Sequence, residues 1–283
     1  DLLRPEWSTS FIRPLIKVAL PFALAGIFVK IYSYVDTLTI AHFFSETEVG
    51  IWAVAYKLTY AFQFLPLAFV AALYPAFSDL VSRNDPDLSR VFHQAMLYMA
   101  FLAAPIVFGI WAVADPLIAI SVGSEFSASA PILGTLVFVL IFIFLDFPIG
   151  SLLNAVDRQA LKTSLMGITM VLNVAMNLWL VPRIGVSGAA IAANVSFAFL
   201  FFSGLYFVPR FVEIDWPRFV WKLTRILLAG LLMGLLVRWA SSVLTLFFTI
   251  PLGALAYLLL LILFGMLRRH DLNNLYAKFA SDR

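Results

Sequence analysis

Long apolar runs alternate with short polar connections along almost the whole chain. Several runs exceed the ~20 residues that a helix needs to cross a ~30 Å hydrocarbon core. Backbone polar groups in lipid must be satisfied within the segment, so such runs are predicted to be helices. The ~10-residue alternating segments typical of a membrane barrel do not occur. We predict an all-α membrane protein with about eight transmembrane helices, at roughly 16–44, 47–82, 87–113, 127–155, 159–181, 186–209, 220–240 and 244–267.

The composition supports a membrane protein and narrows its chemistry. Hydrophobic residues make up 63% of the chain and charged residues 12%, too few charges to cover a soluble domain. Absence of cysteine excludes disulfides and a cysteine nucleophile. The three histidines, His42, His93 and His270, have no metal-ligand spacing. No phosphate-binding loop, dinucleotide fingerprint or hydrolase motif is found. We therefore expect no enzyme, no cofactor, no metal and no nucleic-acid partner.

Basic residues gather in every second connection, which predicts the orientation. Excess Lys and Arg mark cytoplasmic loops, so both termini are expected in the cytoplasm. On the outer side only Arg183 and Arg238 remain, and the connections at 43–50 and 181–188 leave no room for an external domain. The residues expected inside are Arg4, Arg13, Lys17, Arg83, Arg90, Arg158, Lys162, Arg210, Arg218, Lys222, Arg225, Arg268, Arg269, Lys278 and Arg283.

An amphipathic stretch divides the chain after the sixth span. Residues 211–225 carry Pro217 and are predicted to be an interfacial linker. It follows a six-helix lobe, 1–210, and leads into two additional transmembrane helices within 220–267. The remaining residues, 268–283, form a basic amphipathic stretch that we expect to be a tail on the cytoplasmic face.

Ionisable side chains inside spans are costly and are candidates for function. Asp36 and Lys57 lie about 12 and 15 Å below the outer ends of two consecutive spans, at ~1.5 Å per residue. These depths nearly match, so the two side chains are predicted to approach each other across the antiparallel pair. A structural ion pair and a gate or coupling site that opens on binding both require this spacing, and both stay open.

Lys30 lies nearer the midplane, and Ser33, Tyr34 and Thr37 share its helix face. Such a polar stripe usually faces a bundle interior or a water-filled cavity. A lysine there suits an anionic group such as a phosphate. The alternative is a lysine that extends toward the membrane interface.

A carboxylate and several amides complete the polar residues of the spans. Asp146 is followed by Pro148 and Gly150, which favour a kink or a local opening. A proton or cation site is one interpretation, and a carboxylate hydrogen-bonded at the kink is slightly favoured. Interhelical hydrogen bonding is the favoured role of the asparagines and substrate contact the minority one, while Gln63 is a candidate to line a cavity. The amides are Gln63, Asn154, Asn173 and Asn177.

Two segments resemble the signatures of bacterial polysaccharide flippases. The stretch from Tyr34 to Lys57 is similar to their pattern D…G…VG.Y..A.K, with His42 where glycine is common. The stretch from Asn154 to Gln159, the two later asparagines, and the run from Leu180 to Ala190 resemble a second signature, in which an asparagine-bearing helix leads through P..G..GAA into the next span.

This resemblance is to exporters of the multidrug/oligosaccharidyl-lipid/polysaccharide superfamily. Such proteins have two six-helix lobes, often followed by two helices, so the eight predicted spans correspond to the second lobe and the two extra helices. The resemblance implies a missing N-terminal lobe of the same protein as a partner. The chain begins with Asp1 rather than Met, which we take as the expectation of a fragment.

The resemblance also implies a function. A flippase would move a lipid-linked oligosaccharide between leaflets of the bacterial inner membrane by alternating access, with the pyrophosphate in a basic cavity and an ion gradient as the driving force. The matching positions are Asp36, Lys57, Asn154, Asn173 and Asn177. A drug/cation antiporter would prefer acidic cavity residues, a membrane-embedded glycan polymerase or ligase needs a sizeable outer loop, and a non-transporting scaffold is the third alternative.

Overall fold

The structure, a computed structural model, describes residues 9–242 and 244–266. Within these residues the chain is helical, with no strand. The elements are α1 (Thr9–Phe43), α2 (Glu46–Tyr60), η1 (Ala61–Gln63), α3 (Phe64–Ser82), α4 (Asp87–Ala112), α5 (Ala114–Ser121), η2 (Ser124–Phe126), α6 (Ser129–Leu136), α7 (Val139–Ala155), α8 (Gln159–Ile184), α9 (Val186–Phe207), η3 (Val208–Arg210), α10 (Trp216–Ala240) and α11 (Leu246–Leu263).

Eight segments of the described chain are long and apolar enough to cross a membrane. The prediction of an all-α protein with eight transmembrane helices is thus confirmed. Two of the spans consist of more than one helix: α2, η1 and α3 form the span Glu46–Ser82, and α6 with α7 forms Ser129–Ala155. The short α5 between 113 and 127 was not expected from the sequence.

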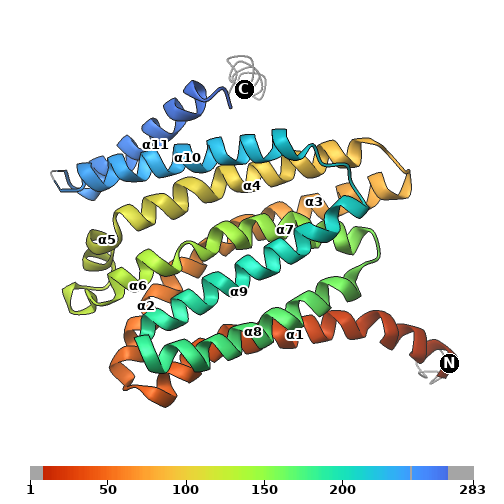
Figure 1. The fold of residues 1–283 in the computed structure, drawn as a ribbon, viewed down its shortest axis with the longest axis horizontal. Helices are drawn as coiled ribbons and strands as arrows, with labels where there is room; N and C mark the ends of the chain where they lie inside the picture. Colours follow the sequence, from red (N-terminus) through yellow and green to blue (C-terminus); the bar gives the residue numbers. More distant parts are fainter. Residues whose placement is uncertain (1–8, 243, 267–283) are drawn as a thin grey trace, which may run out of the picture.

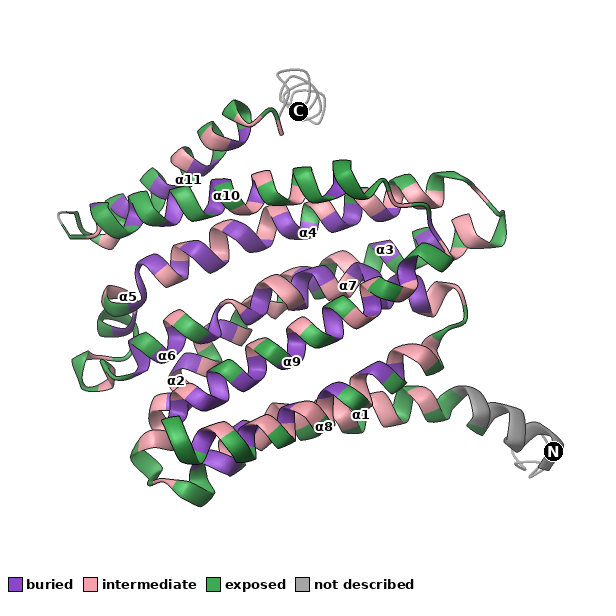
Figure 2. Cartoon of the chain, in the orientation of Figure 1, coloured by how far each residue is buried: buried purple, intermediate pink, exposed green. Residues whose placement is uncertain are grey.

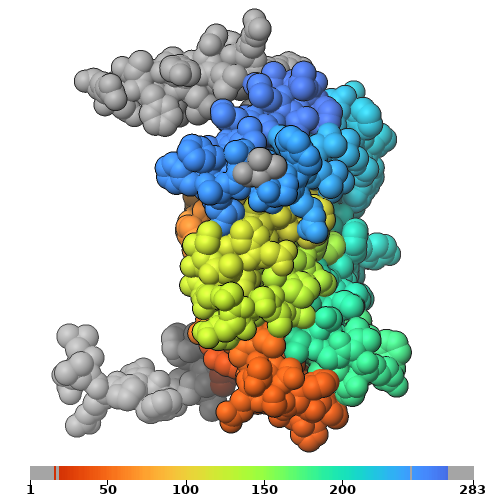
Figure 3. Space-filling view, turned by 90° about the vertical axis from the view of Figure 1, so that its left-hand side faces the viewer, coloured from red at the N-terminus to blue at the C-terminus, as the bar shows by residue number. Residues whose placement is uncertain are grey.

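The spans lie side by side in a broad bundle (Figure 1). At one edge α1 packs on α8, which packs on α9; α7 contacts α9, α3 and α4 in the middle; and α10 packs on α4 at the other edge, covered by α11. The buried side chains concentrate on α4, α7 and α9 (Figure 2). Figure 3 shows the same order from the side, with α10 and α11 stacked on the α4 edge. The two additional helices therefore extend the lobe rather than fill its centre.

The long second span accommodates its 37 residues by breaking. The chain leaves α-helical geometry at η1, directly before Pro66 in the first turn of α3. Proline lacks the N–H that would bond the carbonyl four residues earlier, and its ring clashes with that carbonyl. A short 3₁₀ turn takes up the strain. The break places Gln63 at the bend, where its side chain leaves the regular ridge of the helix.

Two glycines make the α8–α9 hairpin possible. Gly185 has φ +69°, in the left-handed region that side chains rarely adopt. At Gly188 a Cβ would stand 2.7 Å from the backbone carbon of Leu180, so only glycine lets α9 approach α8 this closely. The turn and close helix entry expected from the small residues here are present.

The connection to the additional helices is shorter than the predicted interfacial linker. Only 211–215 lie outside helices, and α10 begins at Trp216, where the Asp215 carboxylate accepts a hydrogen bond from the Arg218 backbone N–H at 3.3 Å. Residues 216–225 of that linker are the first turns of α10, because Pro217 fits the first turn of a helix. The predicted tail, 268–283, lies outside the described residues.

All connections predicted to be cytoplasmic lie at one end of the bundle. Those between α3 and α4, α7 and α8, and α9 and α10 are at the end where α1 begins (Figure 1). Arg83, Arg158 and Arg210 belong to this end, and Arg183 and Arg238 end helices that run the other way. The span count and the alternation of charge therefore agree with each other.

Replacing Gly188 by alanine should lower the free energy of unfolding by about 3 kcal/mol, because the new Cβ meets backbone atoms that cannot rotate away. Equilibrium unfolding of the purified protein in detergent measures the change. Gly26→Ala is the matched control, since a Cβ there has nothing within 4 Å. Equal stability of the two variants would contradict the proposed close approach.

Candidate functional site

A buried carboxylate lies between α1 and α8. Asp36 is 2% exposed, and its Oδ1 accepts a hydrogen bond from Asn177 Nδ2 at 2.6 Å. The same amide nitrogen also donates to the backbone carbonyl of Asn173 at 3.0 Å. Asn173 and Asn177 lie one turn apart, which puts both on the face of α8 that contacts α1. The interhelical hydrogen bond favoured for the asparagines is therefore made by Asn177.

This cluster, Asp36 with Asn173 and Asn177, has more acceptors than donors. The side-chain oxygens of both asparagines are buried and have no partner within the described residues. Buried polar atoms without partners are rare and call for an explanation. Oxygen acceptors around a carboxylate suit a proton or a small cation. The described residues contain no group of three or more His, Cys, Asp or Glu side chains that could hold a metal ion.

The predicted approach of Asp36 and Lys57 is wrong. The structure has no ion pair between them, and Lys57 is exposed on α2 whereas Asp36 is buried against α8. Equal depth fixes the height of a side chain but not the direction in which it leaves its helix. The face of α1 that carries Asp36 is turned toward α8, so the carboxylate finds an amide rather than the lysine.

The polar stripe on α1 also lies elsewhere than expected. Lys30 and Tyr34 are exposed, Tyr34 by 59%, and neither lines a cavity of the described lobe. Tyr32 and Asp36, also one turn apart, take the interior face instead. The prediction that the stripe faces the interior of this bundle is therefore wrong. Its exposed side chains face the outside of the lobe.

An internal cavity of about 460 Å³ lies between α1, the α2–α3 break, α7, α8 and α9. It brings together three residues that the sequence analysis considered separately, namely Gln63, Asp146 and Asn154. It is called the lobe cavity below. Its other lining residues are Val29, Tyr32, Leu67, Val70, Ile143, Phe147, Gly150, Ser151, Lys162, Met166, Phe197 and Leu200.

An ion pair between Asp146 and Lys162 lies in the wall of this cavity. Both side chains are 14% exposed. The sequence analysis placed Lys162 in a cytoplasmic connection, since it follows the start of α8 by only three residues. Its long side chain instead reaches back along α7, over Gly150, where a Cβ would stand 3.3 Å from Lys162 Cε. The i, i+4 spacing of Asp146 and Gly150 was the available signal.

The second oxygen of Asp146 is buried without a partner in the described chain. It faces α9 at Gly204, where an added Cβ would lie 3.7 Å from it. The pairing partner of Asp146 is thus a lysine, not the hydrogen bond at the kink that the sequence analysis slightly favoured. Because the carboxylate gives a partner to the lysine, neither charge is alone in the membrane.

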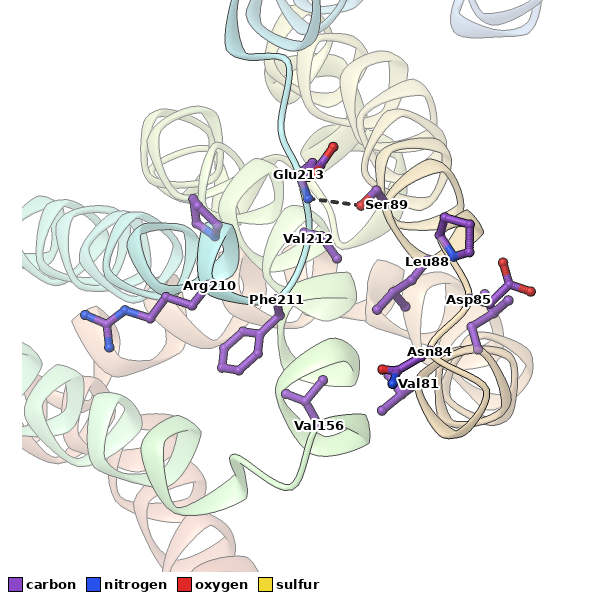
Figure 4. Close-up of a pocket in the computed structure, with 13 residues that line it drawn as sticks. Val81, Asn84, Asp85, Leu88, Ser89, Val156, Arg210, Phe211, Val212 and Glu213 are labelled. Atoms are coloured by element: carbon purple, nitrogen blue, oxygen red, sulfur yellow. Dashed lines mark hydrogen bonds between the residues drawn. The ribbon is translucent and has the colours of Figure 1, made fainter.

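A larger cavity of about 610 Å³ lies at the end of the bundle predicted to be cytoplasmic (Figure 4). The α3–α4 connection and the linker before α10 form most of its wall, and the Glu213 backbone N–H donates to Ser89 Oγ at 3.0 Å. Arg210 and Asp85 point outward on opposite sides (Figure 4). None of the predicted site residues lines it, so it is set apart from the polar interior.

An eight-span helical lobe with a buried carboxylate cluster and a polar cavity has the features of a membrane transporter half. A family model described as "Polysaccharide biosynthesis protein" matches residues 2–131. The chain is 27% identical over 249 residues to the "Probable low-salt glycan biosynthesis flippase Agl15" of Haloferax volcanii, covering 86% of this chain and 53% of that protein. It is 23% identical over 250 residues to the "Lipid II flippase MurJ" of Bacillus subtilis, covering 82% and 45%.

The fold is similar to that of a solved structure of the lipid II flippase MurJ in an inward closed conformation. The TM-score is 0.72 at 16% identity, and the match covers 92% of this chain and 56% of that one. This chain therefore spans about half the length of the proteins it matches.

These comparisons confirm the resemblance to polysaccharide and lipid-linked glycan flippases. The relatives named here are flippases and not enzymes, which confirms the prediction that the protein is not an enzyme. The localisation is confirmed as a multi-pass membrane protein. The bacterial inner membrane stays a prediction, as the relatives come from an archaeon and a bacterium.

Asp146→Asn should lower the free energy of unfolding by about 3 kcal/mol, because it leaves the Lys162 charge buried and unpaired. The double variant Asp146→Asn/Lys162→Gln should lose less than the sum of the single variants. Unfolding in detergent measures each term. The exposed pair Asp87–Arg90 is the control and should contribute under about 1 kcal/mol. Additive losses at Asp146 and Lys162 would exclude their coupling.

Proposed function

We propose that this chain is the second half of a flippase that moves a lipid-linked oligosaccharide from the cytoplasmic to the outer leaflet by alternating access. The observation that carries the proposal is the polar interior of the lobe, formed by the Asp36 cluster and the lobe cavity. Polar groups at such depth are expensive in a membrane and are kept mainly where they serve transport. The flippase relatives support the choice of substrate class.

The other half is proposed to be an N-terminal lobe of the same protein. In the described lobe, Lys30 and Tyr34 on α1 and Lys57 on α2 are exposed side chains within spans. Exposed lysines are costly against lipid but not beside a water-filled passage. We therefore place these three residues on the surface that faces the first lobe. There the lysines would attract the pyrophosphate of the substrate, and membrane lipids would cover the remaining surface.

Asp36 is proposed as the coupling site of the transport cycle. Its carboxylate binds a proton or a monovalent cation, and the free oxygens of Asn173 and Asn177 supply further ligands. The cluster joins α1 to α8, so filling and emptying it changes how firmly these helices pack. Binding that differs between two conformations shifts their populations, which is what coupling to a gradient requires.

Asp36→Asn in the full-length protein should reduce gradient-driven flipping by about tenfold or more, or about 1.4 kcal/mol of barrier. Flipping of a fluorescent lipid-linked oligosaccharide in proteoliposomes, with and without proton or sodium gradients, measures the effect. Glu46→Gln is the control, because Glu46 is exposed at the start of α2. Unchanged gradient dependence in Asp36→Asn would remove the coupling role.

The same vesicles separate the rival functions. Export of a cationic dye without flipping of the glycan lipid would favour the drug/cation antiporter. Transfer of the glycan to an acceptor would favour a polymerase or ligase. Either outcome would overturn the proposed function. Flipping without gradient dependence would keep the substrate class and discard only the coupling.

The proposed orientation has a direct test, because the chain has no cysteine of its own. Single cysteines at the exposed positions Ser82 and Ser242 lie at opposite ends of the bundle. In intact cells a membrane-impermeant maleimide should label Ser242→Cys and leave Ser82→Cys unlabelled until the membrane is opened. The reverse pattern would invert the topology.

A further inference from the structure

The lobe cavity offers hydrogen-bonding groups that the lobe itself does not use. Gln63 and Asn154 line it from the bend of the second span and from α7, and neither side chain forms a hydrogen bond with another described residue. Each amide presents both donors and an acceptor. The remaining asparagines of the described spans are bonded within the bundle, Asn177 to Asp36 and Asn194 to backbone carbonyls.

The ionised groups of the cavity neutralise each other. Asp146 and Lys162 form the ion pair described above, and no other Lys, Arg, Asp or Glu lines the cavity. An anion would have to displace Asp146 from Lys162 and leave a carboxylate unpaired in the membrane interior. A free cation would face the lysine. The charge arrangement therefore favours a neutral ligand.

Aromatic rings flank the amides. Tyr32 and Phe197 meet edge to face with ring centroids 5.4 Å apart, and Phe147 lines the same space from α7. Rings of this kind present apolar faces beside polar tips. Free amides next to aromatic faces match a ring that carries hydroxyl groups at its rim and C–H groups on its faces. A sugar ring has this chemistry.

The position and size of the cavity admit such a ligand. Its volume of about 460 Å³ lies within the ~300–1,000 Å³ usual for small-molecule sites. α1 packs on α8 and α2, whereas α3 packs on α7 and α4, so the cavity separates α1 from α3. Leu67, one of its lining residues on α3, is 55% exposed, which marks the opening side.

We propose that the lobe cavity is a saccharide subsite that holds one neutral sugar ring, with Gln63 and Asn154 bonding its hydroxyl groups and Tyr32 and Phe197 covering its faces. This proposal rests on the proposed function, since the sugar would belong to the glycan being moved. The Asp146–Lys162 pair positions α7 against the start of α8 and thereby holds Asn154 in place.

Binding of soluble probes to the full-length protein in lipid nanodiscs tests the subsite. The probes are N-acetylglucosamine, methyl glucoside and inorganic pyrophosphate, followed by saturation-transfer NMR and calorimetric titration. At least one of the two sugars should bind, and Gln63→Leu or Asn154→Leu should each weaken it about tenfold, the cost of one buried hydrogen bond. Gln94→Leu is the matched control, because Gln94 is exposed on α4 and does not line the cavity.

The outcomes separate this subsite from the proposed function. Pyrophosphate binding without sugar binding, or sugar binding that Gln63→Leu and Asn154→Leu leave intact, would overturn the subsite. Absence of binding by all three probes would also overturn it, while flipping in proteoliposomes would still support the transporter. Loss of flipping with retained, Gln63-dependent sugar binding would instead overturn the proposed function. Thermal unfolding of each variant identifies a misfolded protein, and Gln63→Glu, which keeps the shape, then replaces Gln63→Leu with the same expected loss.

Discussion

Every polar group that this lobe carries into the membrane has to find its partner inside the lobe, because lipid offers none. The arrangement of α1, α7 and α8 depends on this constraint. Asp36 bonds Asn177 across the α1–α8 contact, and Asp146 pairs with Lys162 across the α7–α8 hairpin. Each polar contact joins two helices, so α8 is held on both sides. Without these partners the same carboxylates would be unpaired in a nearly apolar bundle.

The solutions to this constraint are incomplete, and that is their functional interest. Oxygens of Asn173, Asn177 and Asp146 stay unpartnered although they are buried. A lobe built only for stability would replace such groups with apolar ones, as buried ion pairs often cost more than they return. A transport half needs sites whose occupancy changes during the cycle, and groups with unused bonding capacity provide them. The Asp36 cluster and the lobe cavity are two such places at different positions along α1, linked by the face that Tyr32 and Asp36 share.

Half of a two-lobed protein also leaves a surface whose partner is elsewhere. The relatives are about twice as long as this chain, and Lys30, Tyr34 and Lys57 are exposed on α1 and α2. The two extra helices lie at the opposite edge, on α4, where they do not obstruct this surface (Figure 1). We place the passage for the glycan between the lobes, with the lobe cavity opening toward it.

The sequence by itself determined the membrane class, the eight spans and the segments at which the chain turns, because length, apolarity and the rigid φ preferences of proline and glycine act locally. The Pro66 break and the Gly185 turn belong to this part. Which charges meet was decided only by the tertiary structure. Asp36 and Lys57 share a depth, yet the rotation of α1 turns the carboxylate to Asn177, and a lysine placed in a connection reaches down to Asp146. Depth follows from counting residues, but direction follows from how helices pack, and long side chains add several ångströms that no count contains.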